Sequence, residues 1–97
     1  MSVNTARGEV LAPMAGVDRR LCLTLGALAE IESGLKVQGV EALAARLRDL
    51  SAADLKVMLA ALLRGGGEHD LPGRLTETGV TPREAVEAVA AAFAAAA

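Results

Sequence analysis

The chain has 97 residues, so one domain covering residues 1–97 is the natural expectation. Its formal net charge is -2, and its Lys and Arg residues are scattered along the chain. Nucleic-acid binding usually needs a basic face that neutralises phosphates, and the sequence has no Trp or Tyr on which bases could stack. The composition therefore argues against a nucleic acid and favours a protein partner.

Cysteine usage and hydropathy suggest where the protein works. Cys22 is the only cysteine, which excludes an internal disulfide and fits a cytoplasmic location. The stretch Met1–Arg7 lacks the apolar core of a signal peptide. No run approaches the roughly 20 apolar residues of a membrane span, and the tail Ala85–Ala97 is short and alanine-rich, as in a packing helix. We expect a cytoplasmic protein with no membrane partner.

Residues 7–25 show the period-two alternation of a β-hairpin. We expect strands at about Gly8–Met14 and Arg20–Leu25, joined by a turn at Ala15–Asp18. The alternating apolar residues are Val10, Ala12 and Met14 on the first strand and Leu21, Leu23 and Leu25 on the second. Pro13 cannot donate a ladder hydrogen bond, so we expect its strand to be an edge or to be irregular at that point. A hairpin alone is marginal in water, so it must pack on other elements.

Two short helices are predicted next. Thr24 can cap a helix that begins near Gly26, and Gly34 is a natural left-handed stop for it. A second helix is expected from Val40 to Asp49. Their apolar stripes are Leu28, Ile31 and Leu35 in the first helix, and Val40, Leu43, Ala44 and Leu47 in the second.

The third helix has the clearest start signal. Ser51 is the expected N-cap, with Asp54 at the N3 position of an imperfect capping box, because Asp is shorter than the usual Glu or Gln. Leu50 and Leu55 have the spacing of a hydrophobic staple. The run Gly65–Gly67 ends the helix. Residues 26–64 therefore hold three helices.

A fourth helix is expected over residues 81–97, after a loop at 65–80 with one short turn near Asp70–Leu75. Thr81 caps it, Pro82 occupies the first helical position and Glu84 completes a capping box. The pattern predicts an α+β, mostly helical fold: an N-terminal two-stranded antiparallel β-hairpin packed against about four α-helices. The expected core residues are Leu23, Leu25, Leu28, Ile31, Leu43, Leu47, Leu55, Leu59, Leu62 and Val89.

No group of residues predicts catalysis, a metal or a cofactor. His69, between Glu68 and Asp70, is the only histidine and is interpreted as part of a solvated loop. The glycine run 65–67 follows a helix and precedes Glu68, unlike a phosphate-binding loop, which follows a strand and ends in Gly-Lys-Ser/Thr. Cys22 is expected to pack as a small hydrophobe. We therefore do not expect an enzyme.

Charged residues on the first two helices are interpreted as ordinary surface. Glu30 and Glu32 stand two residues apart, so they project from different faces of a helix and do not form a carboxylate pair. Arg46, Arg48 and Asp49 are interpreted in the same way.

The N-terminal third, taken as a unit, carries a family resemblance. Arg7–Val10 reads RGEV, and after the turn Leu21–Glu32 reads LCLTLGALAEIE. This block resembles the small tail proteins of bacterial gene transfer agents, which are related to the tail assembly chaperones of long-tailed phages. In that family an RGEV strand leads through a hairpin into an LTLGALAELE-type junction, and Ile31 stands where Leu is common. The order of later elements matches up to about Asp70.

The resemblance implies a hairpin packed against several helices and a role in building a phage-like tail. Chaperones of this class are thought to coat the tape measure protein before the tail tube polymerises around it. Some members are described instead as tail tube components. A tube subunit normally needs a larger β-structure to form rings, so we expect a tail assembly chaperone, with a structural tail subunit as the alternative. The expected partners are phage-like tail proteins, the tape measure protein first; a homo-oligomer stays open.

A chaperone for a helical protein needs an apolar face that its own fold leaves partly uncovered. The C-terminal helix is the best candidate, because its alanines permit close approach and it is terminal. Val86, Val89 and Phe93 are the expected partner-binding residues. The alternative is that Phe93, the only aromatic residue, simply completes the core.

Overall fold

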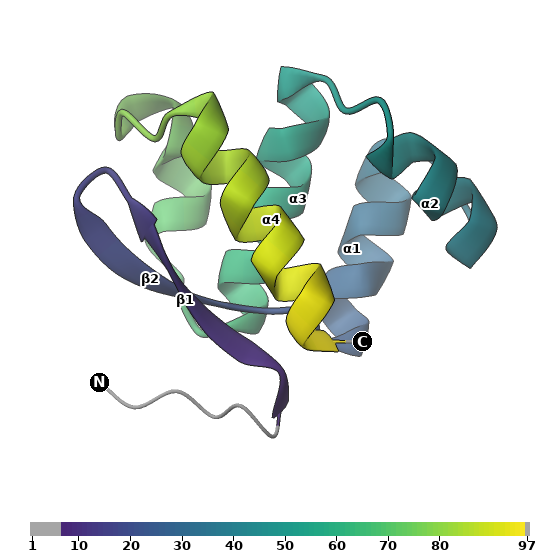
Figure 1. Cartoon of the computed structure of the whole chain (residues 1–97), viewed down its shortest axis with the longest axis horizontal. Coiled ribbons are helices and arrows are strands. Elements are labelled where there is room, and N and C mark those ends of the chain that lie inside the picture. Colours follow the sequence, from purple (N-terminus) through teal and green to yellow (C-terminus); the bar gives the residue numbers. More distant parts are fainter. Residues whose placement is uncertain (1–6, 97) are drawn as a thin grey trace.

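The computed structural model describes residues 7–96 (Figure 1). In chain order its elements are β1 (Glu9–Met14), β2 (Val17–Cys22), α1 (Leu25–Leu35), α2 (Val40–Leu47), α3 (Ala52–Gly65), the 3-10 segment η2 (Leu71–Glu77) and α4 (Pro82–Ala96). The expected α+β fold, an N-terminal hairpin with four α-helices, is confirmed. Residues 1–6, where the sequence lacks a signal-peptide core, and Ala97, in the last predicted helix, lie outside the described residues, as does the side chain of Val40.

The hairpin is tighter than the sequence predicts. Glu9 pairs with Cys22 and Met14 with Val17, so only Ala15 and Gly16 form the turn. Both turn residues have positive φ, 53° and 84°, as in the two-residue turns whose twist matches that of the strands. The predicted turn at Ala15–Asp18 is therefore too long, and β2 begins earlier and ends before Leu23 because Thr24 already caps α1.

The alternation of the first strand holds from Leu11 to Met14, whereas Glu9, expected on the outer face, is buried and Val10 is half-buried. Ala12 and Met14 are buried, whereas Leu11 and Pro13 are exposed. The buried face lies against helices: β1 packs on α4 and β2 on α3, with the hairpin at one end of the helical bundle (Figure 1). Both strands of the sheet are edges, as the position of Pro13 requires.

Helix α1 begins where the sequence predicts but ends later. The Thr24 hydroxyl accepts a hydrogen bond from the backbone N–H of Ala27 at 3.0 Å, which confirms the cap. The helix continues through Gly34, and the left-handed residue that ends it is Lys36 (φ 59°). The predicted stop at Gly34 is wrong because this glycine serves packing: a Cβ there would overlap the Val57 side chain of α3.

Helix α3 is the centre of the fold, in contact with α1, α4, β2 and η2. Its capping box is confirmed with Asp in place of Glu: the Ser51 hydroxyl accepts from the Asp54 N–H at 3.1 Å, and the Asp54 carboxylate accepts from the Ser51 N–H at 3.2 Å. The glycine run ends the helix as predicted, with Gly67 at positive φ. Gly66 has a second role, because a Cβ there would overlap the carbonyl oxygen of Arg20 in β2.

The core gathers around α3. Of the predicted core residues, Ile31, Leu43, Leu59, Leu62 and Val89 are buried, and Leu23, Leu28, Leu47 and Leu55 are partly buried against them. Leu25 is 83% exposed, so its assignment to the core is wrong. It is the first residue of α1 instead of part of a strand, and the period-two pattern no longer governs its direction.

Candidate protein-binding groove

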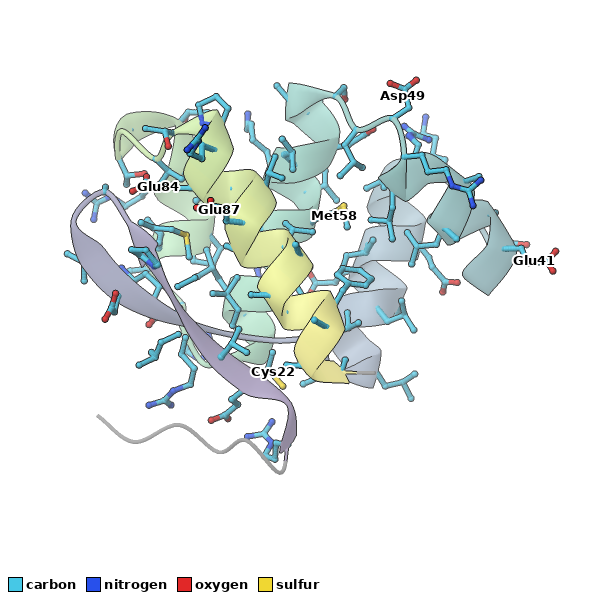
Figure 2. The ribbon with its side chains drawn as sticks, in the orientation of Figure 1. Cys22, Glu41, Asp49, Met58, Glu84 and Glu87 are labelled. Atoms are coloured by element: carbon cyan, nitrogen blue, oxygen red, sulfur yellow. The ribbon has the colours of Figure 1, made fainter. Side chains whose placement is uncertain are left out.

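Helix α4 is fixed at its start by a capping box that also holds the hairpin. The Thr81 hydroxyl accepts from the Glu84 N–H at 3.1 Å, and the Glu84 carboxylate accepts from the Thr81 N–H at 3.0 Å. The same carboxylate oxygen accepts from the Ala15 N–H of the hairpin turn at 3.3 Å, where α4 meets the hairpin (Figure 2). These hydrogen bonds lower the pKa of Glu84, and the bond from the Thr81 N–H has the largest effect.

Helix α4 divides its apolar side chains between the core and the surface. Ala85, Ala88 and Ala92 are buried, so these small residues let α4 approach β1 and α3 closely. Val86 is 51% exposed, Val89 is 4% exposed, and Phe93 is half-buried. The helix therefore keeps part of its apolar stripe at the surface.

The three predicted partner-binding residues line one apolar groove of about 250 Å³. The complete lining is Val86, Val89, Ala90 and Phe93 from α4, Leu47 from α2 and Leu50 from the link between α2 and α3. Phe93 packs against the core and also lines the groove, and its role in partner binding stays a prediction. Val89 is buried and lies at the bottom of the groove.

Three lining residues were missed from the sequence. Leu47 was assigned to the core and Leu50 to a local staple, and Ala90 was not among the expected partner-binding residues. Their shared position depends on the link between α2 and α3 lying beside α4, a long-range relation that helical periodicity does not contain. The one local hint of this part of the lining in the sequence is Leu50, an apolar residue next to the charged Asp49.

Next to the lining residue Leu47, Arg46 makes an ion pair that the sequence did not predict. The Arg46 guanidinium donates to both carboxylate oxygens of Asp54, each at 2.9 Å, and to the carbonyl oxygen of Leu35 at 3.2 Å. The interpretation of Arg46 as ordinary surface is therefore wrong, while Arg48 and Asp49 are exposed as expected. The hydrogen bonds from Arg46 lower the pKa of Asp54, and the same bonds raise the pKa of Arg46.

The other polar residues considered in the sequence have separate surroundings. Glu30 pairs with Arg64 at 2.6 Å, whereas Glu32 accepts from the Gly39 N–H at 2.9 Å, so the two carboxylates do not act together. Glu68, in the loop after α3, is half-buried and accepts a hydrogen bond from the Arg20 N–H of β2 at 3.1 Å.

His69 and Cys22 are not brought together. His69 is exposed, whereas Cys22 is buried and its thiol donates to the carbonyl oxygen of Arg7 at 3.3 Å. Among residues 7–96, no cluster of three or more His, Cys, Asp or Glu side chains could hold a metal ion. Within the same residues, no helix combines the length and apolar character needed to cross a membrane.

These features define a class: a small α+β protein with an apolar groove beside its C-terminal helix. The chain belongs to the family described as "Phage tail tube protein, GTA-gp10", whose model matches residues 7–97. No curated protein and no solved structure matches it significantly. The protein is thus a phage-like tail protein, as the resemblance implied. The description names a tail tube, which favours the structural alternative over the chaperone.

Proposed function

We propose that this chain is a non-enzymatic tail protein of a gene transfer agent or prophage that works in the cytoplasm by binding other tail proteins. The observation that carries the proposal is the apolar groove, which places Val86 and Phe93 beside Leu47 and Leu50. An exposed apolar surface of this kind is suited to a protein partner and offers no polar group for turnover.

The first candidate role is a structural subunit of the tail, either in the tube or associated with it. The family description supports this role directly. In such a subunit the groove would receive an apolar segment of a neighbouring tail protein, and the contact would persist in the finished particle. The partner here is a second structural protein of the tail.

The second candidate role is a tail assembly chaperone for the tape measure protein, and two observations favour it. The described sheet has only two strands, and Pro13 on β1 lacks the N–H that a further strand would need, so ring formation through β-structure has little to build on. Val86, Val89 and Phe93 also follow the i, i+3, i+7 spacing of the apolar face that an amphipathic helix packs against a partner.

Quantitative mass spectrometry of purified particles separates the two roles. A structural tube subunit is expected at a copy number comparable with that of the other tail proteins. A chaperone is expected in the producing cells but absent, or far below that copy number, in the particles. Absence from both particles and tail-assembly intermediates would contradict the proposed function in either form.

A further inference from the structure

Helix α2 lies at the periphery of the fold. Figure 1 shows it at the opposite end from the hairpin, beyond α1. Among residues 7–96, the backbone of α2 approaches the other elements at few points. Of its described side chains, Leu43 is buried and Leu47 and Arg46 are half-buried, while Glu41 projects outward (Figure 2). The helix therefore has a narrow attachment to the rest of the molecule.

The hydrogen bonds of that attachment are concentrated at the end of α2. The Arg46 guanidinium reaches two neighbouring elements at once, through Asp54 at the start of α3 and the carbonyl oxygen of Leu35 at the end of α1. The beginning of α2 is held more weakly. Its N-cap, Gly39, has φ 90° and no side-chain cap, and its N–H donates to the Glu32 carboxylate at 2.9 Å in an exposed position.

We propose that α2 is a hinged flap, latched by Arg46, whose release widens the groove beside α4. Gly39 at one end and residues 48–50 at the other provide the hinges. Leu47 of α2 forms one wall of the groove, and Leu43 of the same helix is buried. Outward movement of α2 therefore opens the groove and uncovers further apolar surface. The inference concerns the motion of this chain alone and holds for either role of the protein.

Hydrogen exchange of the full chain, followed amide by amide, tests the flap. In the wild type, amides of residues 43–47 should exchange through openings that are more frequent than those exposing residues 58–62 in α3. Arg46→Gln should accelerate exchange at 43–47 by at least about tenfold, because it removes charged hydrogen bonds, and should change residues 58–62 much less. Arg83→Gln, at an exposed arginine of α4 that lies outside α2, its hinges and the groove lining, is the control and should leave both segments unchanged.

Two results would overturn the proposal. One is wild-type exchange at residues 43–47 as slow as in the α3 core, which would show that α2 opens only with global unfolding; this result needs no variant. The other is equal acceleration of both segments by Arg46→Gln, which would make Arg46 a contributor to global stability and nothing more. An increase in binding of an apolar fluorescent dye by Arg46→Gln, with the circular dichroism spectrum retained, would further support the flap.

Discussion

At the scale of single residues, Leu59 shows how firmly the centre of α3 is embedded. It is 2% exposed, so Leu59→Ala removes buried apolar contacts and should destabilise the protein by about 2–5 kcal/mol in urea unfolding. Leu25→Ala is the control, because Leu25 is 83% exposed and its truncation should change stability by less than about 0.5 kcal/mol. Equal losses for the two variants would mean that the core is misplaced.

Gly66 provides a second prediction at the scale of single residues. A Cβ at this position would overlap the Arg20 carbonyl oxygen, a backbone atom that cannot move aside, so Gly66→Ala should destabilise by more than about 1 kcal/mol. Gly73 faces open space and lacks positive φ, so Gly73→Ala should be neutral or slightly stabilising. Thermal unfolding of both variants checks the pair. An unchanged melting temperature for Gly66→Ala would contradict the close approach of the end of α3 to β2.

The sequence predicted those residues whose role depends on near neighbours in the chain. Thr24, Ser51 and Thr81 cap their helices as expected, because a cap and its partner stand three residues apart. Gly34 and Arg46 were misinterpreted for the opposite reason. Gly34 is needed because Val57 crosses it, and Arg46 is engaged because Asp54 and the end of α1 come within reach.

At the scale of elements, Glu84 couples the hairpin to α4 and makes stability depend on pH. Its pKa is lowered from its ordinary value of 4.5, so the unfolded chain takes up its proton at higher pH than the folded chain does. The stabilisation is therefore complete above pH 4.5 and is lost as the pH falls through 4.5 and then through the lower folded pKa.

We expect Glu84→Gln to remove part of this acid dependence. The melting temperature of the wild type should fall more steeply than that of the variant as the pH is lowered from about 5 towards 3. Asp54 also has a lowered pKa, so some acid dependence should remain in the variant. If the melting temperatures of the wild type and the variant fall equally with pH over this range, the charge of the Glu84 carboxylate adds no stability beyond that of an amide.

Element boundaries were predictable where a cap marked them and less so where strands ended. The predicted turn was two residues too long, because Val17 and Asp18 contain no signal that distinguishes a turn from a strand beside Ala15-Gly16. The short turn expected near residues 70–75 is the segment η2, over Leu71–Glu77. Its kink at Arg74 could not be read from the sequence.

At the scale of the whole molecule, binary patterning was enough to predict the architecture but not the groove. The period-two and period-3.6 stretches specify a hairpin and four helices, and these had to pack on one another. The three α4 residues named from the sequence do share the groove. Its opposite wall could not be predicted, because Leu47 and Leu50 face α4 only through the path of the chain between α2 and α3.

The central claim is that the groove beside α4 binds another tail protein, and a matched pair of valine variants tests it most directly. Val86 is 51% exposed and lines the groove, while Val17 is 49% exposed at the hairpin tip, so neither truncation should impair folding much. Binding to tail proteins encoded beside this chain, including tape measure fragments, would be measured by titration calorimetry.

Val86→Ala should weaken binding by about 1 kcal/mol, or about fivefold in Kd, and Phe93→Ala by at least that much beyond any loss of folding. Val17→Ala should bind as the wild type does. Unchanged binding by folded Val86→Ala and Phe93→Ala variants would contradict the assignment of the groove. Failure of the wild type to bind any of these tail proteins would contradict the account as a whole.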